Sequence, residues 1–267
     1  MKERVDVLAT NQGLFESREQ AKRGIMSGIV VDAKSGNRFD KPGEKIDQNI
    51  DLRLKGEKLK YVSRGGLKLE KALSEFNICV KGLNCLDIGA STGGFSDVML
   101  QSGAKHVYAL DVGTNQLAWK IRNDDRVTVM EQFNFRNALL SDFSYGQPEF
   151  ASIDVSFISL SLILPPLFLI LKSGGEVAAL IKPQFEAGRE QVGKNGIIKD
   201  PVVHKQVIEK VLSMAEKVGF SIKNLTFSPI KGGAGNVEFL VHLAKDEIPS
   251  MKINVEAILQ NEKEQLN

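Results

Sequence analysis

The sequence predicts an α/β fold with a mainly parallel seven-stranded sheet, preceded by a small, separate α+β unit. Segments typical of strands and of helices alternate from residue 83 onward, and a glycine-rich turn follows the first strand of that series. The excess of basic residues lies before this turn. Alternating strands and helices build a parallel sheet with helices on both faces, because each helix returns the chain to the same edge.

The charge of the chain is unevenly distributed. Lys and Arg number 35 and Asp and Glu 33 in 267 residues, and this net charge of +2 excludes a strongly basic nucleic-acid-binding chain. Residues 1–71 nevertheless carry 16 basic and 11 acidic residues, whereas the other 196 residues carry 19 basic and 22 acidic ones. The net charge of residues 1–71, here called the head, is therefore +5, and that of the remaining residues is −3. This asymmetry indicates two parts with different partners.

Nothing in the sequence is typical of a secreted or membrane protein. Cys79 and Cys85 have the spacing of neither a disulfide scaffold nor a zinc site, and residues 1–6 contain no apolar run. The longest apolar stretch, residues 160–171, contains two prolines and is shorter than the roughly 20 residues that a spanning helix needs. We therefore expect a cytoplasmic protein that neither enters a membrane nor requires a metal.

Two short helices and a strand are expected in the basic head. The first helix begins at Arg4 and ends before Gly13. The second follows Ser17, which can form a capping box with the glutamine three residues on. Gly28 ends the second helix, and a strand follows at residues 29–31.

The order of these elements resembles the S4 RNA-binding domain. The matching segments are RVDVLA, SREQAKRGIMSGIVVD and KPGEKI. The resemblance implies that residues 1–60 bind RNA, mostly through phosphates and shape. Arg18, Lys22 and Arg23 can share one face of the second helix, and with Arg4 they are the candidate RNA contacts of the head.

Three further segments follow the head. Residues 61–82 form a connector, residues 83–245 the α/β domain, and residues 246–267 a polar tail with one short helix. The last two strands flank a glycine loop at residues 231–236, so we expect them to pair antiparallel. The expected strands are 84–88, 106–112, 127–131, 150–156, 176–182, 221–227 and 237–244, and the expected helices are 94–102, 116–122, 158–171 and 201–218.

The turn after the first strand of this domain has the pattern Asp-x-Gly-x-x-x-Gly-Gly, from Asp87 to Gly94. Glycines at such a turn let a cofactor lie against the main chain at a helix N-terminus. The spacing differs from the dinucleotide pattern GxGxxG and is closer to the S-adenosylmethionine turn of class I methyltransferases. Asp111 ends the next strand, where an acid can accept hydrogen bonds from both ribose hydroxyls.

Four charged residues lie beside the expected ligand crevice. Asp154 and Lys182 end two strands, Glu238 begins the last strand, and Lys68 follows an Arg-Gly-Gly turn in the connector. In this chain order they resemble the Lys–Asp–Lys–Glu tetrad of the FtsJ-type ribose 2′-O-methyltransferases. Together with the head, the chain resembles the TlyA family over residues 3–244, through SRGGLKLEKAL, DIGASTGGF, DVSFISL, LIKPQFEAGR and GNVEFL.

The resemblance implies S-adenosylmethionine-dependent methylation of ribosomal RNA at a ribose 2′-hydroxyl, in this family that of cytidine. Ribosomal RNA or a ribosomal subunit is the implied partner of a monomer or weak homo-oligomer. Lys182 would be the main activator with Lys68 in support, because two ammonium groups stabilise the oxyanion that develops on the hydroxyl. Asp154 would orient Lys182 and face the methionine end of the cofactor. Glu238 would hold Lys68 or the ribose.

The cofactor-binding residues are expected around the glycine turn and the neighbouring strand ends. An acidic residue often meets the adenine amine in FtsJ-type proteins, but Asn134 stands at that point, so its side-chain carbonyl would accept the hydrogen bond. Phe135 is the aromatic residue expected against adenine. The full set is Asp87, Gly89, Ala90, Ser91, Gly93, Gly94, Phe95, Asp111, Asn134, Phe135 and Asp154.

A charged, glycine-rich segment at residues 185–196 follows Lys182 and is expected to overhang the crevice as a lid or RNA-contacting loop. Arg189 and Lys194 in this segment are candidate phosphate contacts, as is Arg64 in the connector.

Alternatives to this hypothesis remain open. The glycine turn also contains G-x-S-x-G, typical of α/β-hydrolases, but His204 and His242 fall in helix and strand patterns. Residues 154–157 loosely resemble the Asp-Pro-Pro-Tyr box of base methyltransferases without either proline. An intact tetrad argues against a non-catalytic RNA-binding protein, and the lack of an apolar span argues against a membrane-lytic one.

Overall fold

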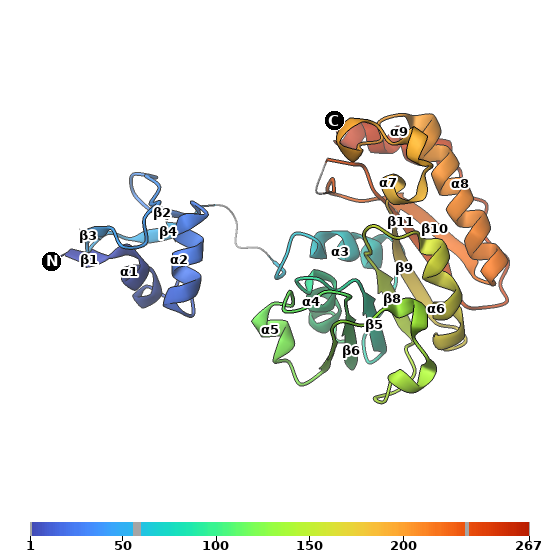
Figure 1. The fold of residues 1–267 in the computed structure, drawn as a ribbon, viewed down its shortest axis with the longest axis horizontal. Coiled ribbons are helices and arrows are strands. Elements are labelled where there is room, and N and C mark those ends of the chain that lie inside the picture. The colour runs from blue at the N-terminus through green and yellow to red at the C-terminus, as the bar shows by residue number, and fades with distance from the viewer. Residues whose placement is uncertain (1, 56–59, 233–234, 267) are drawn as a thin grey trace. The chain divides into compact units, whose positions relative to one another are not determined.

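Two compact units make up the chain, Met1–Lys60 and Tyr61–Asn267, each with a hydrophobic core of its own (Figure 1). The computed structural model describes residues 2–55, 60–232 and 235–266. Val5, Ile25 and Val30 are fully buried in the core of the first unit. Each unit therefore has the apolar interior that an independent fold requires.

Two short helices and two small antiparallel sheets form the first unit. Its elements are β1 (Lys2–Arg4), α1 (Val5–Asn11), α2 (Arg18–Met26), β2 (Val30–Asp32), β3 (Lys45–Asp47) and β4 (Leu52–Leu54), with β1 paired to β3 and β2 to β4. Ser17 caps α2 as expected, since its hydroxyl accepts a hydrogen bond from the backbone N–H of Gln20 at 3.3 Å. Arg4 has an extended backbone and ends β1, so α1 begins one residue later than expected.

A seven-stranded sheet with the order β10–β11–β9–β8–β5–β6–β7 runs through the second unit. Its strands are β5 (Asn84–Ile88), β6 (His106–Leu110), β7 (Val127–Met130), β8 (Phe150–Ile153), β9 (Glu176–Ile181), β10 (Ser221–Phe227) and β11 (Phe239–Ala244). β11 is antiparallel to both of its neighbours, and the other pairs are parallel. The predicted fold class, a mostly parallel seven-stranded sheet, is confirmed, and the last two strands pair antiparallel as expected.

Helices cover both faces of this sheet (Figure 1). On one face, α3 (Gly66–Glu75), α4 (Gly94–Gln101) and α5 (Trp119–Arg122) bury Leu69, Met99 and Ile121. On the other face, α6 (Leu164–Ile170) and α8 (Pro201–Val218) bury Leu167 and Ile208. The remaining short elements of the unit are α7 (Pro183–Glu186), η1 (Phe135–Asn137), η2 (Leu140–Asp142), η3 (Leu160–Leu162), η4 (Arg189–Gln191) and η5 (Lys194–Gly196).

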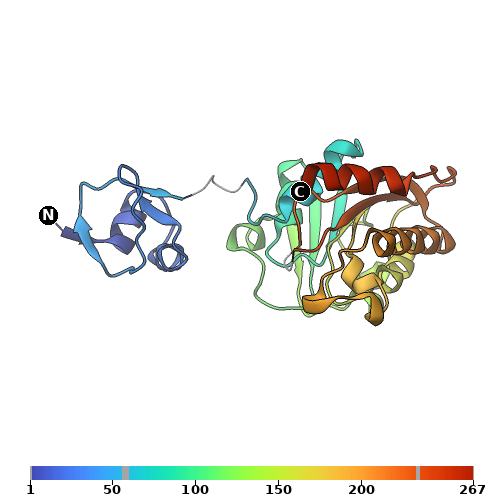
Figure 2. The same cartoon turned by 90° about the horizontal axis from the view of Figure 1, so that it is seen from above.

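The C-terminal segment is part of the core, although the sequence predicted a polar tail. It contains α9 (Val255–Leu266), the red helix that lies beside α8 in both views (Figures 1 and 2). Val255 and Leu259 are each only 7% exposed and belong to the same apolar cluster as α6 and α8. Four-residue spacing places them on one face of the helix, which explains why a mostly polar segment packs.

None of the helices in the described ranges combines the length and the apolar composition that crossing a membrane requires.

The packing of α9 predicts a cost for truncating its core residue. We expect Leu259→Ala to lower the free energy of unfolding by about 2–4 kcal/mol, because it removes a buried side chain and leaves a void. Met251→Ala is the control, since Met251 is 61% exposed just before α9. Urea unfolding followed by circular dichroism measures both. Equal stabilities of the two variants would show that α9 contributes nothing to the core.

Candidate active site

Four charged side chains form a continuous row at one edge of the sheet. The Nζ of Lys68 lies 2.6 Å from an oxygen of Glu238 and 3.6 Å from one of Asp154. The other oxygen of Asp154 lies 2.5 Å from the Nζ of Lys182. This charged row therefore runs in the order Glu238, Lys68, Asp154 and Lys182. It contains the four residues that the sequence selected as a tetrad.

The sheet topology explains how residues up to 170 positions apart meet in the charged row. β8 and β9 are parallel, so Asp154 and Lys182, which follow these strands, lie at the same edge. β11 is antiparallel to β9 and pairs its first residue with the last of β9, which places Glu238 at that edge too. Lys68 is contributed by the first turn of α3, which packs against β9 and β11.

The charged row is buried, and its charges balance. Lys68, Lys182 and Glu238 are 7%, 9% and 3% exposed, whereas the side chain of Asp154 is 21% exposed. Ions withdrawn from water need partners of opposite sign, and each of these has at least one. Lys182 also donates to the hydroxyl of Ser156 at 3.0 Å. An ammonium has three donors, so one remains without a partner among the described residues.

A cavity with two lobes adjoins the charged row. The first lobe, about 230 Å³, is lined by Lys182 and by Ser63 and Gly65 of the connector. The second lobe, about 310 Å³, extends past the glycine turn to Asp111 and Phe135. The lobes adjoin each other, because four residues line both: Gly89, Ser91, Asp154 and Ser156.

The glycine turn fits closely between the charged row and the connector. Gly89 has φ +88°, and a Cβ there would lie 2.4 Å from the carbonyl oxygen of Asp154. A Cβ on Gly94 would lie 2.2 Å from the hydroxyl of Ser63 and 3.0 Å from the backbone nitrogen of Gly66. The connector therefore packs directly on the turn, two residues before Lys68.

Most of the predicted cofactor-binding residues line the cavity. They are Gly89, Ala90, Ser91, Gly94, Phe95, Asp111, Asn134, Phe135 and Asp154. Gly93 instead caps α4 in a left-handed conformation, with φ +93°, against the side chains of Leu117 and Ile121.

Asp111 and Asn134 differ in what they offer a ligand. The two carboxylate oxygens of Asp111 each accept one backbone N–H, from Ser91 and Gly113, both at 2.8 Å. A carboxylate has about four lone-pair sites, so acceptor capacity remains. The side-chain carbonyl of Asn134, expected to accept from adenine, instead accepts from the backbone N–H and the Nε of Arg136, both at 3.2 Å. Asn134 therefore caps η1 with the atom that the sequence assigned to the cofactor.

Asp87 lies beneath the glycine turn, away from the cavity. It is fully buried and accepts hydrogen bonds from the hydroxyls of Ser96 at 2.7 Å and Ser152 at 3.2 Å. Burial raises the pKa of the Asp87 carboxyl to about 7, although both serines oppose the shift. Because Ser96 is in α4 and Ser152 is in β8, Asp87 joins the two elements that flank the turn.

An aromatic pair that the sequence patterns did not indicate lies at the second lobe of the cavity. Phe157 lines the second lobe, is 90% exposed and has φ +63°, which is a strained conformation for a bulky residue. Its ring centroid lies 5.1 Å from that of Phe185. Exposed aromatic rings of this kind can stack on nucleic-acid bases. The motif DVSFISL contains the residue, but its strained backbone has no signature in the sequence.

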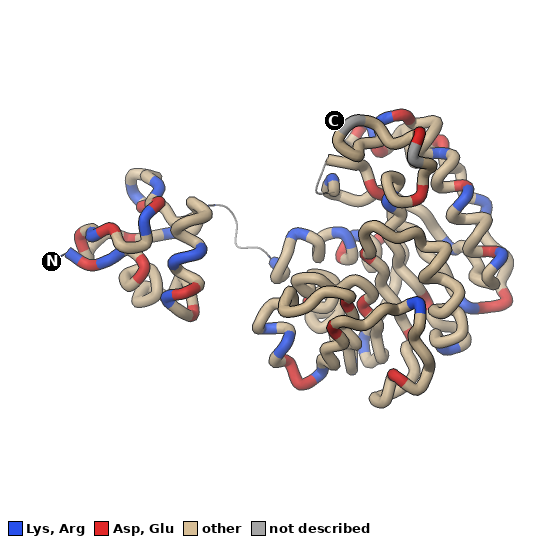
Figure 3. The backbone as a smooth tube through the Cα atoms, viewed as in Figure 1, with Lys and Arg blue, Asp and Glu red and all other residues tan. Residues whose placement is uncertain are grey.

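The candidate RNA contacts of the first unit differ in how they are paired. Arg4 and Arg18 hold the buried Asp6 at 2.9 and 3.0 Å, and the hydrogen bond from Arg4 does most to lower the pKa of Asp6 to about 2. Lys22 pairs with Glu19 at 2.8 Å. Arg23 is exposed and has no ion pair among the described residues. Figure 3 shows acidic residues interspersed with the basic ones along this unit.

Three predicted contacts lie in the second unit. Arg64 is exposed in the connector, between Ser63 and Gly65, which line the first lobe. The side chains of Arg189 and Lys194 lie outside the described part of the structure.

Comparisons with known proteins cover most of the chain. A model of the FtsJ-like methyltransferase family matches residues 61–245. The chain is 60% identical over 242 residues to YqxC of Bacillus subtilis, named as an rRNA methyltransferase, covering 91% of this chain and 85% of that protein. It is 40% identical over 242 residues to TlyA of Mycobacterium tuberculosis, named a 16S/23S rRNA (cytidine-2′-O)-methyltransferase, covering 90% and 89%.

A solved structure from Streptococcus thermophilus, described as a hemolysin, is 61% identical with a TM-score of 0.78 and covers 99% of this chain and 97% of that one. The family match lies within the second unit, whereas this structure also spans the first.

The buried Asp87 predicts an unusual dependence of stability on pH. Its pKa is raised from an ordinary 3.8 to about 7, so the folded state binds a proton that the unfolded state has lost between these values. The contribution of Asp87 to the free energy of unfolding should therefore fall as the pH rises through this window, by at most about 1.4 kcal/mol per pH unit.

Asp87→Asn removes this titration and keeps the shape of the side chain. We expect the stability of the wild type minus that of the variant to fall between pH 4 and pH 7, in urea titrations at matched ionic strength. Parallel pH profiles of the two proteins would contradict the buried, proton-binding state of Asp87.

Proposed function

The chain belongs to the FtsJ-like methyltransferase family, and on that premise we propose that it transfers a methyl group from S-adenosylmethionine to a ribose 2′-hydroxyl of ribosomal RNA. The observation that carries the proposal is the charged row beside the glycine turn. A ribose hydroxyl is a weak nucleophile, and an ammonium held against it stabilises the oxyanion that develops. Because TlyA is named for cytidine, we extend that substrate to this chain.

The two-lobed cavity has the shape and chemistry to hold S-adenosylmethionine. Its lobes of about 230 and 310 Å³ fall together within the range of small-molecule sites. In this proposal Asp111 accepts hydrogen bonds from the ribose hydroxyls of the cofactor, and Phe135 provides an apolar surface for adenine. Gly89 lets the ligand lie against the main chain. When bound, the cofactor supplies an electrophilic methyl group on a sulfonium.

Lys182 is the activating residue in this mechanism. It lines the first lobe and has a donor left for the 2′-oxygen, which lowers the pKa of the hydroxyl. Asp154 holds the ammonium of Lys182 with one oxygen and approaches Lys68 with the other. Glu238 fixes Lys68 in turn. The row then presents an ammonium to the substrate in a fixed geometry, and such placement accelerates a transfer between two bound groups.

The first unit is proposed to bind the RNA as an S4-like domain. Its support is the exposed basic side chains of α2, of which Arg23 has no acidic partner among the described residues. Arg4 and Arg18 are tied to Asp6, so we assign them a structural role as well as phosphate contact. Phosphate contacts position RNA and make its binding depend on salt.

Replacing the activating residue should stop methyl transfer. We expect Lys182→Ala to reduce the rate at least about a hundredfold, as loss of one oxyanion donor does elsewhere, with S-adenosylmethionine affinity unchanged. The measurement is mass-spectrometric mapping of ribose methylation in ribosomal RNA incubated with each protein. Lys172→Ala is the control, because Lys172 pairs with Glu149 on the exposed surface. Normal methylation by the Lys182 variant would refute the mechanism.

Removing the exposed Arg23 side chain should weaken RNA binding. We expect Arg23→Ala to lower the affinity for ribosomal RNA severalfold and to reduce the slope of log affinity against log salt by about 1, as for one lost phosphate contact. Lys217→Ala, at the exposed end of α8, is the matched control. Binding measured across a salt series separates the two. An unchanged slope for the Arg23 variant would exclude that contact.

A further inference from the structure

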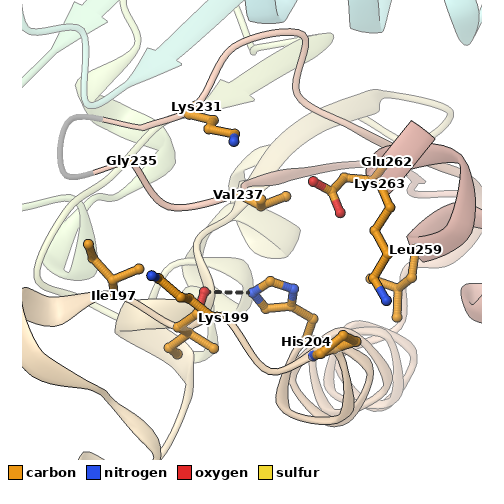
Figure 4. Close-up of a pocket in the computed structure, with 11 residues that line it drawn as sticks. Ile197, Lys199, His204, Lys231, Gly235, Val237, Leu259, Glu262 and Lys263 are labelled. Carbon is orange, nitrogen blue, oxygen red and sulfur yellow. Dashed lines mark hydrogen bonds between the residues drawn. The ribbon is translucent and has the colours of Figure 1, made fainter. Parts of the chain in front are cut away.

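A second cavity, of about 410 Å³, contains none of the residues of the charged row in its lining. Figure 4 shows the residues that line it. It is bordered by residues 197–201, the start of α8, residues 231, 235 and 237 between β10 and β11, and α9. The volume is sufficient for a nucleotide-sized ligand. Its chemistry is set by one carboxylate, one histidine and three lysines.

Glu262 of α9 is a largely buried residue whose carboxylate has no partner among the described residues. It is 8% exposed, and within the described chain it makes no hydrogen bond and no ion pair. Its side chain points into the hollow (Figure 4). Burial raises the pKa of Glu262, and the charges of Lys231 and Lys263 oppose that shift. The carboxylate oxygens can therefore accept hydrogen bonds from a ligand that enters the hollow with N–H groups.

His204 provides a second acceptor in the same hollow. It is 4% exposed, and its Nε2 lies 3.2 Å from the carbonyl oxygen of Ile198. A carbonyl can only accept, so Nε2 donates, and Nδ1 of the neutral ring is left as an acceptor. Burial lowers the pKa of His204 and so favours that neutral form. The other ring nitrogen faces the hollow (Figure 4).

The remaining lining residues are chemically complementary to a nucleotide. Ile197, Val237 and Leu259 form apolar walls, between which a planar ring can lie. Lys199 and Lys231 are exposed at the cavity, where ammonium groups can meet a phosphate. A carboxylate with a neighbouring acceptor matches guanine, whose Watson–Crick edge presents an N–H and an amino group side by side. Adenine and cytosine present one amino group beside an acceptor nitrogen.

We propose that this cavity binds a guanine nucleotide of the RNA substrate, read by Glu262 and His204. The inference rests on the proposed function, and the cavity is connected to that site along the chain. Val237 lines the cavity, and the next residue, Glu238, pairs with Lys68. Asn236 accepts from the backbone N–H of Ile198 and donates to the carbonyl of Gly196, both at 2.9 Å. Residues 236–238 therefore contribute to both sites.

The test is nucleotide binding to the full chain, with S-adenosylhomocysteine added to fill the two-lobed cavity. Guanosine, adenosine and cytidine 5′-monophosphates are titrated and followed by NMR or calorimetry. A bidentate contact discriminates between bases by about 1–3 kcal/mol, so guanosine monophosphate should bind roughly tenfold tighter than the others. Glu262→Gln should abolish that preference, because an amide has a single acceptor oxygen and cannot accept hydrogen bonds side by side from both the N–H and the amino group of guanine. Glu264→Gln, an exposed change in the same helix, should preserve it.

A second experiment tests whether the cavity binds a guanosine within RNA as well as the free nucleotide. A short single-stranded RNA with one internal guanosine should displace guanosine monophosphate, whereas the same strand with adenosine in that place should not. Displacement by neither strand would overturn the RNA assignment. Equal binding of all three nucleotides, or guanosine monophosphate binding unaffected by Glu262→Gln, would overturn the site itself. Methyl transfer by the wild type, measured in parallel, shows whether the proposed function survives that outcome.

Discussion

Two ammonium groups and two carboxylates cannot be buried at a sheet edge unless they pair, and much of the second unit depends on that condition. The charged row draws on α3 and on the ends of β8, β9 and β11, so the elements must arrive in register. A slip of one residue in β11 would turn Glu238 to the opposite face of the sheet and leave Lys68 with a weaker partner. Removal of one member leaves an unpaired buried charge, so fold and chemistry are constrained together.

The glycine turn is the second constraint, because there is no room for a side chain at two of its positions. Gly89 and Gly94 have no side chains where the backbone of Asp154 and the connector approach. The carboxylate of Asp87 accepts hydrogen bonds from Ser96 and Ser152 and so links the turn to α4 and β8. The connector that begins the second unit is therefore fitted against the same turn that borders the cavity, and it positions Lys68 within one helical turn of that contact.

The sheet and the tetrad could be predicted because strand ends are local features whose meeting point follows from parallel topology. Asp87 shows where that reasoning stops: strand alternation turns its side chain toward α4, and a motif does not record direction. The motif likewise gave no sign of the hydrogen bonds of Asn134, whose side-chain carbonyl accepts from Arg136 two residues away. The sequence did not indicate that α9 packs on the core, because its apolar residues are few. Their burial depends on contacts with the apolar cluster that also contains residues of α6 and α8. No sequence pattern signals the left-handed backbone of Phe157.

The exact balance of the charged row has a consequence for its reach. Two positive and two negative groups have no net charge, so their field falls off faster with distance than that of a single ion and is screened beyond a Debye length of about 8 Å at physiological salt. Such a site does not draw a polyanion from a distance. Long-range attraction must come from cations elsewhere in the chain, whose surplus lies in residues 1–71. The charge distribution therefore separates two distances of action: the surplus of cations can act at long range, whereas the balanced row acts only on a group in contact with it.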